Sequence, residues 1–176
     1  MSGLIGGAQS KSGVVTAHRV FEVDSWRLTA DFTGNKQPID GNLERTDVNA
    51  FSKVGIGMTQ SSGVFTYPTA GVWKISFQWY GYSSGANRYV FGNIQSSHNS
   101  GSDWSWTAVG KTAIPDIGEY GHGSLYVSGF LNVTTPTTFR TRFTVERDSG
   151  GSEVGTQGST SDNNTYMLFQ RLGEVP

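Results

Sequence analysis

The stretch GVFTYPTAGVWKISFQW, residues 63–79, decides the fold. After Gly71, large apolar side chains alternate with smaller or polar ones, and the apolar set is Trp73, Ile75, Phe77 and Trp79. A period of two places each set on its own face of an extended chain, which predicts a strand with an aromatic core face. Pro68 and Gly71 are typical of a tight turn, and Phe65 and Tyr67 indicate a short strand before it. We therefore interpret the stretch as a hairpin that leads into a half-buried strand.

The composition favours many short strands rather than helices. The 176 residues include 24 glycines, and only 15% of the residues are charged, a profile typical of strands joined by turns. Further stretches of strand character follow at 88–95, 124–133, 139–147 and 165–172. We predict an all-β, two-sheet jelly-roll sandwich of about eight to ten antiparallel strands. Its core is predicted to contain Trp73, Ile75, Phe77, Leu125, Val127, Leu131, Phe139 and Phe143.

The chain is predicted to have two parts. Residues 1–19 are rich in glycine and serine and are expected to form an extended N-terminal anchoring arm, whereas residues 20–176 form the jelly-roll domain. The sizeable apolar groups of the arm are Leu4, Ile5, Val14 and Val15. Burying them against another protein would stabilise attachment, and we expect them to anchor the arm. The first residues lack the basic and long apolar blocks of a signal peptide, so no ordinary export signal is expected.

Charge and cysteine content exclude several classes of function. The net charge of −1 provides no electrostatic footprint for nucleic acid or for an anionic membrane. No apolar run approaches the length of a membrane span. The absence of cysteine excludes a disulfide scaffold and a thiolate metal site. We expect neither nucleic acid nor membrane among the partners.

Catalytic and metal-binding patterns are weak. Residues 81–85 match the G-x-S-x-G nucleophile motif, but strand-like residues follow where that motif needs a helix, so a turn is predicted. The histidines, which lack metal-ligand spacing, are His18, His98 and His122. Asp116 and Glu119, near the glycines at 121 and 123, could supply oxygen ligands to Ca²⁺, although a solvated loop is favoured. We therefore expect no enzyme, no cofactor and no metal site.

Trp104 and Trp106 are the candidate glycan contacts. They lie beside a loop rich in serine, asparagine and glycine. Aromatic faces flanked by small hydrogen-bonding groups suit sugars, because ring stacking and polar pairing act together. The alternative is that both rings share one side of a strand and are buried in the sandwich.

Three stretches resemble one known family in the same order. The series Gly63-x-Phe65-x-x-Pro68-x-x-Gly71-x-Trp73-x-Ile75-x-Phe77 resembles the signature of the globular heads of the first complement component, relatives of tumour necrosis factor. Residues 123–143 resemble that family's strand, turn and strand unit, and residues 165–172 resemble its closing strand. The similarity covers roughly residues 26–172. The collagen stem and cysteines common in animal members are absent.

The resemblance implies a ten-strand jelly roll that assembles as a compact homotrimer. Three such bodies packed around an axis bury apolar surface in a domain-core-like interface. On the strand 125–133, Tyr126 and Phe130 lie on the parity opposite to the core residues. They are too apolar to suit water, and we predict that they line the threefold interface. The alternative is that an inter-strand loop covers them.

A second resemblance concerns the N-terminal segment. MSGLIGGAQSKSG followed by FEVDSWRL is similar to the starts of small structural proteins of marine tailed phages, which carry an anchoring segment before a jelly-roll body. It implies a non-enzymatic, homotrimeric decoration or cement protein on the capsid exterior of a virion. Its partners would be further copies of itself and the major capsid protein or another virion structural protein. The alternative is a trimeric tail-fibre or tip module that recognises cell-surface carbohydrate.

Overall fold

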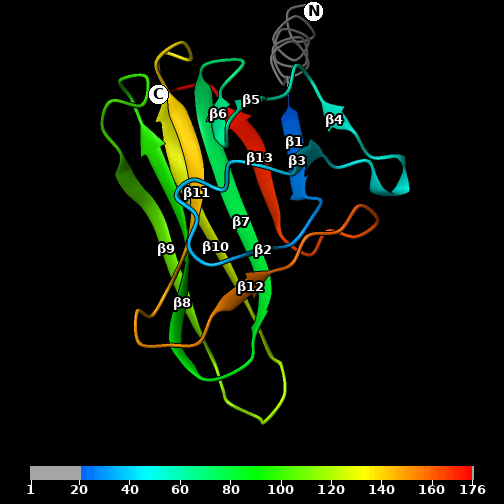
Figure 1. Ribbon diagram of the computed structural model, residues 1–176. Coiled ribbons are helices and arrows are strands. Elements are labelled where there is room, and N and C mark those ends of the chain that lie inside the picture. Colours follow the sequence, from blue (N-terminus) through cyan, green and yellow to red (C-terminus); the bar gives the residue numbers. More distant parts are fainter. Residues whose placement is uncertain (1–20, 176) are drawn as a thin grey trace, which may run out of the picture.

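The computed structural model describes residues 21–175, which form two antiparallel β-sheets packed face to face (Figure 1). The eight-stranded sheet contains β1 (Glu22–Leu28), β2 (Phe32–Thr33), β3 (Leu43–Arg45), β4 (Lys53–Val54), β7 (Gly71–Ser83), β10 (Gly121–Val133), β12 (Val154–Thr156) and β13 (Tyr166–Gly173). The five-stranded sheet contains β5 (Thr59–Ser61), β6 (Val64–Thr66), β8 (Asn87–Ser97), β9 (Ser105–Ile114) and β11 (Arg140–Arg147). A 3-10 turn, η1 (Val48–Ala50), lies between β3 and β4.

The predicted all-β, two-sheet fold is confirmed. The described residues contain more strands than expected, because six of them have only two or three residues, too few to show an alternating pattern. One of these, β12, lies inside residues 148–164, a stretch rich in glycine and serine whose composition is typical of a loop. The predicted arm, with Leu4, Ile5, Val14 and Val15, lies outside the described residues.

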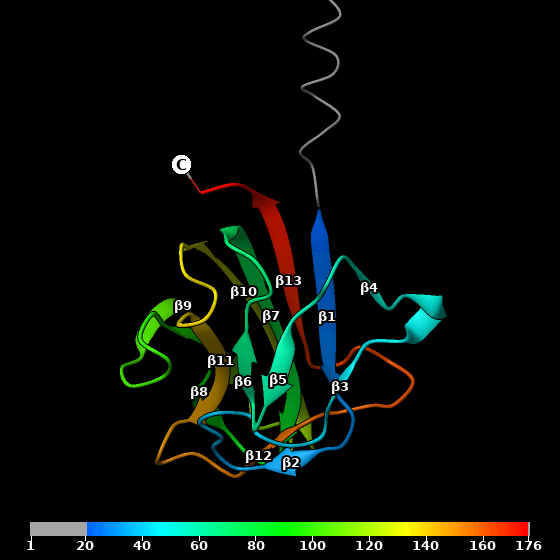
Figure 2. The same ribbon diagram turned by 90° about the horizontal axis from the view of Figure 1, so that it is seen from above.

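The long strand β7 is the centre of the eight-stranded sheet. On one side it pairs with β10 along its whole length, from Gly71 opposite Val133 to Ser83 opposite Gly121. On the other side it pairs first with β13 and then with β12. Figure 2 shows β7 and β10 beside β13 and β1 in one layer, with β8, β9 and β11 in the other.

The hairpin predicted for residues 63–79 is wrong. β6 pairs with β5 and β11 in the five-stranded sheet, whereas β7 belongs to the eight-stranded sheet. The segment with Pro68 therefore carries the chain from one layer to the other. Phe65, on β6, and Tyr67, just after it, are buried, since both face the space between the sheets. Alternation predicts which side chains are buried, but it does not show which strand a segment will pair with.

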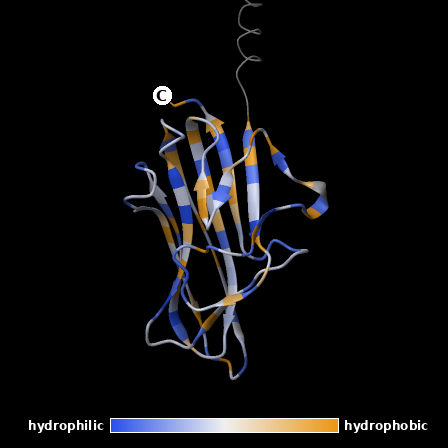
Figure 3. Cartoon of the chain, turned by 45° about the horizontal axis from the view of Figure 1, so that its top comes forward, coloured by the Kyte–Doolittle hydropathy of each residue, from blue (hydrophilic) through white to orange (hydrophobic). Residues whose placement is uncertain are grey.

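The core consists of the apolar faces that the sequence identified. Trp73, Ile75, Phe77 and Trp79 are completely buried on β7. Phe65 connects the layers, with ring centroids 5.6 Å from Phe143 and 5.0 Å from Phe169. The other predicted core residues, Leu125, Val127, Leu131 and Phe139, belong to the same cluster or pack against it. Figure 3 shows the alternation of hydrophobic and hydrophilic residues along the strands.

Edge strands β9 and β10 close one side of the sandwich by packing against each other. A Cβ at Gly110 would overlap the side chain of Val127, and a Cβ at Gly129 would lie 2.8 Å from Thr107. Glycine at these two positions therefore allows the two sheets to approach closely along this edge.

The two ends of the body are distinguished by where the chain enters it. Glu22, at the start of β1, pairs with Arg171, which in turn pairs with Trp73 near the start of β7. The opposite end contains Ser83, at the end of β7, which pairs with β12. The turns that enter β8 and β10 are at the bottom of Figure 1, below β12 and β2. Ten residues of extended β7 separate these ends, a distance of roughly 33 Å.

No helix among residues 21–175 is long and apolar enough to span a bilayer.

The core assignment predicts a large difference between two tryptophans. Trp73→Ala should lower the free energy of unfolding by about 3–5 kcal/mol, because it removes a fully buried aromatic side chain and leaves a cavity. The matched control is Trp106→Ala, which truncates a half-exposed ring and should change stability by about 0.5 kcal/mol or less. Chemical denaturation followed by circular dichroism measures both, and equal losses would contradict the assigned core.

Candidate functional site

The outer face of the eight-stranded sheet carries an aromatic band across β10, β7 and β13. Tyr126 on β10 and Tyr166 on β13 lie on either side of Gln78 in register. The Tyr126 hydroxyl donates a hydrogen bond to Ser76 Oγ at 2.8 Å, which holds the ring across the sheet. Partial burial, with a smaller effect of neighbouring Tyr126, raises the pKa of Tyr166 above its usual value.

Tyr126 and Phe130 face away from the core, as their parity predicts. Their side chains are 51% and 64% exposed in the single chain. Phe130 lies opposite Lys74, and Leu172 at the end of β13 is also exposed. These large apolar groups lie on the outside of an edge strand and its neighbours, an arrangement typical of an interaction surface. Their assignment to a threefold interface stays a prediction.

The two candidate glycan contacts, Trp104 and Trp106, have different surroundings in the structure. The Arg142 guanidinium lies 4.2 Å from the centroid of the Trp104 ring, and partial burial lowers the pKa of Arg142. Arg142 Nε also donates to Gln95 Oε1 at 2.6 Å. Trp106 is on β9, opposite Gln95 of β8, and its side chain is 54% exposed. The alternative that both rings are buried in the core is therefore wrong, because Trp106 is exposed, whereas Trp104, which precedes β9, is partly buried beside Arg142.

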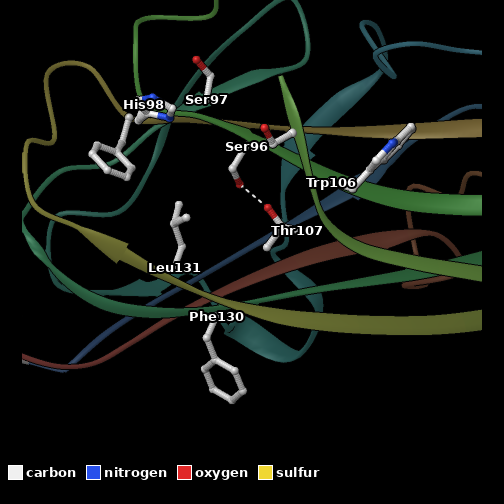
Figure 4. A pocket seen from close by; sticks show the side chains of 9 residues that line it. Ser96, Ser97, His98, Trp106, Thr107, Phe130 and Leu131 are labelled. Atoms are coloured by element: carbon white, nitrogen blue, oxygen red, sulfur yellow. Dashed lines mark hydrogen bonds between the residues drawn. The ribbon is translucent and has the colours of Figure 1, made fainter. Parts of the chain in front are cut away.

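Trp106 borders a hollow of about 300 Å³ between the two sheets at the edge formed by β9 and β10 (Figure 4). Its lining consists of Ser96, Ser97, His98, Ser105, Trp106, Thr107, Phe130, Leu131 and Phe139. Leu131 points from β10 towards His98, whereas Phe130 points to the opposite side of that strand. The hollow therefore has a candidate glycan contact on one rim and a candidate interface residue on the other.

The hydroxyls in this hollow largely bond to neighbouring groups of the protein. Thr107 Oγ1 donates to Ser96 Oγ at 2.7 Å, and the Ser96 hydroxyl is 3.2 Å from Thr141 Oγ1. Ser97 Oγ donates to Asn99 Oδ1 at 2.7 Å and accepts from the Gly101 amide. Trp106 thus provides an exposed ring, but most of the polar groups beside it already have partners.

The patterns considered for catalysis and metal binding do not form such a site. Ser83, the central residue of the G-x-S-x-G match, is buried and donates to the Glu153 carbonyl at 3.0 Å. Strand β8 follows it, as the predicted turn requires. Asp116 accepts from the Gly118 amide in an exposed loop. In the part of the chain that the structure describes, no group of three or more His, Asp or Glu side chains is arranged to hold a metal ion.

A second hollow was not identified from the sequence. It lies at the end of the body opposite to the chain entry and has a volume of about 340 Å³. Its lining consists of Asp31, Tyr82, Tyr120, His122 and Gln157. These residues come from four segments of the chain, since Tyr120 and His122 are close neighbours in sequence, and only the folded sheet brings the four together. Asp31 and Gln157 lie in connections, which have no periodic signal, so the sequence offers no means of combining them.

No family model and no curated protein sequence matches this chain. Solved structures do match it: Eiger TNF from S. frugiperda has a TM-score of 0.64 with 12% identity, covering 90% of this chain and 96% of that one. Murine APRIL at pH 5.0 has a TM-score of 0.61 with 9% identity, covering 86% and 99%. The chain therefore has a TNF-like jelly-roll fold. At this identity the similarity shows the fold alone.

Proposed function

We propose that this protein is a non-enzymatic, homotrimeric structural protein of a phage virion, which decorates or cements the capsid exterior and is attached through residues 1–19. The main support is the exposed aromatic surface of Tyr126 and Phe130 on β10 in a TNF-like jelly roll. A TNF-like body is consistent with a trimeric structural or binding module. The resemblance of the first residues to phage structural proteins supports the virion assignment.

The outer face of β10 provides the contact between protomers. Burying a large apolar side chain contributes about 1.5–3 kcal/mol, and Tyr126, Phe130 and Leu172 each expose more than half of their surface. Tyr126 is also fixed by its hydrogen bond to Ser76, so less side-chain freedom is lost on association. A trimer would cover the surface that a lone protomer leaves in water.

The position of the chain entry suits attachment through the arm. Residues 1–20 join the body at Phe21, next to the start of β1. Cyclic symmetry places corresponding ends of all three protomers on the same side of a trimer. Three arms would therefore reach one surface together, and their combined binding would be far stronger than that of one arm. The partner is the major capsid protein or another structural protein of the virion.

The interface can be tested by placing charge on it. Wild-type protein should sediment as a trimer at micromolar concentration, and the double variant Tyr126→Asp, Phe130→Asp should shift towards monomer, because two carboxylates would be buried without partners. Val109→Asp on exposed β9 is the matched control and should remain trimeric. A wild-type protein that is monomeric under these conditions would disprove the trimer.

The arm can be tested by deletion. Removing residues 1–13 should leave a folded trimer that no longer associates with particles, since the truncation removes Leu4 and Ile5 from the docking segment. Cosedimentation with particles that lack the protein measures binding, and circular dichroism verifies the fold. Wild-type occupancy by the truncated protein would mean that the body itself is the anchor.

A second candidate function is a trimeric tail-fibre or tip module that recognises cell-surface carbohydrate. The exposed Trp106 ring beside a 300 Å³ hollow favours it. On a glycan array, wild-type binding that is lost in Trp106→Ala would support this function. Wild-type binding that the variant retains would exclude Trp106 as the contact.

A further inference from the structure

The hollow formed by Asp31, Tyr82, Tyr120, His122 and Gln157 has the features of a prepared binding site. It lies where β7 ends and β10 begins, at the end of the body away from Phe21. Figure 1 shows the turns that enter β8 and β10 at the bottom, with β12 and β2 above them. If the arm faces a particle, this hollow faces outward. Its volume of about 340 Å³ lies within the range of small-molecule sites in proteins.

Backbone contacts hold the walls of the hollow in place. The backbone N–H of Gln157 donates to the Tyr80 carbonyl at 2.9 Å, and the backbone N–H of Gly158 donates to Asp31 Oδ1 at 2.9 Å. The Tyr82 ring lies directly over Gly155 of β12, where any Cβ would overlap it. The positions of Asp31, Tyr82 and Gln157 are thus set before any ligand arrives, which lowers the entropy cost of binding.

The aromatic walls form a corner. The Tyr82 and Tyr120 rings are nearly perpendicular, at 89°, with centroids 5.3 Å apart. The His122 ring stacks on Tyr80 at 5.7 Å and 18°, and its Nδ1 lies 3.2 Å from the Tyr80 hydroxyl. Tyr120 is 61% exposed, so its ring surface is accessible to a ligand. The Tyr80 contact directs the second imidazole nitrogen, Nε2, away from that partner.

Several polar side-chain groups that line this hollow have no hydrogen-bond partner among the residues that the structure describes. Among residues 21–175, none donates to Asp31 Oδ2 or bonds to the side-chain amide of Gln157, to the hydroxyls of Tyr82 and Tyr120, or to His122 Nε2. This differs from the hollow at Trp106, where most hydroxyls bond to neighbouring groups. Donors, acceptors and aromatic surface around one concavity are the combination that a polyhydroxylated ring requires.

We infer that this hollow binds a neutral pyranose sugar at the terminus of a glycan. The C–H face of the sugar packs on the exposed Tyr120 ring, while Asp31 Oδ2 accepts hydrogen bonds from its hydroxyls. The side-chain amide of Gln157 and His122 Nε2 form hydrogen bonds with further hydroxyls of the sugar. The site is built within one protomer, so it requires neither the trimer nor the virion location proposed above.

The charge of the site argues for a neutral sugar. Asp31 is acidic, and so is Glu119, which precedes Tyr120 in the chain, whereas the lining contains no lysine or arginine. A carboxylated sugar would therefore be repelled. An organic cation is the main competing ligand, because aromatic rings and a carboxylate also attract quaternary ammonium groups. The five polar groups of the lining that have no partner within the protein favour the sugar, because a quaternary ammonium group can form no hydrogen bond with any of them.

The test is a titration of the full-length protein with neutral monosaccharides, namely glucose, galactose, mannose and N-acetylglucosamine, followed by NMR. At least one should bind with a Kd on the order of 1 mM, as expected for a ligand of this size. Saturation transfer from protein to sugar should be strongest on the C–H face. Sialic acid and tetramethylammonium are titrated in parallel.

The variants locate the binding. Tyr120→Ala and Asp31→Asn should each weaken it by about tenfold, and Asp31→Asn removes the charge while retaining an oxygen that can accept from Gly158. Ile117→Ala is the matched control, because it truncates an exposed apolar residue in the same loop as Tyr120 but outside the hollow. The melting temperature of each variant verifies its fold.

Three outcomes would overturn the inference. The first is that none of the four neutral sugars binds. The second is binding that Tyr120→Ala and Asp31→Asn leave unchanged, which would place the sugar elsewhere. The third is binding of tetramethylammonium without any sugar, which would assign the hollow to a cation. Sedimentation of the same preparations reports the oligomeric state separately, so failure of the trimer cannot be mistaken for failure of this site.

Discussion

The burial of one aromatic face of β7 is the constraint on which the rest of the structure depends. Trp73, Ile75, Phe77 and Trp79 are all fully excluded from water. A strand with such a face requires a second layer above it, and the five-stranded sheet provides that layer through Phe65 and Phe143. Because β7 also pairs along its whole length with β10, the same strand fixes the position of the sheet edge. The core and the outer surface are therefore set by one element.

The pleat of β7 and its neighbours also determines what the outer face displays. Once the odd-numbered residues of β7 and β10 are buried, Tyr80, Tyr82, Tyr126 and Phe130 must lie on the other side. This side carries two kinds of aromatic surface. Towards the chain entry, Phe130 and Tyr126 form an apolar surface suited to another protomer. At the far end, Tyr82 and His122 combine with Asp31 and Gln157 in a polar hollow. The two surfaces are compatible with separate roles in assembly and recognition.

This division connects the proposed function with the inferred sugar site. The chain enters the body next to Glu22, and the polar hollow lies about ten residues of β7 further along. An arm that attaches at the first end presents the second end to the surroundings of the particle. Three equivalent hollows on a trimer would bind a surface carrying many glycans far more strongly than one hollow binds a single sugar. Attachment through the proposed arm and sugar binding at the opposite end therefore do not exclude each other.

The sequence by itself determined the all-β class, the buried parity of β7, β10 and β11, and the outward orientation of Tyr126 and Phe130, because an alternating pattern records burial residue by residue. Only the tertiary structure decided which strands pair. It assigned β6 and β7 to different sheets and placed Trp106 on an outer face, since alternation distinguishes two faces without showing which one is covered. It also created the hollow of Asp31, Tyr82, Tyr120, His122 and Gln157, whose members belong to segments far apart in the chain. Such a site depends on backbone pairing between distant segments, which no local pattern of side chains encodes.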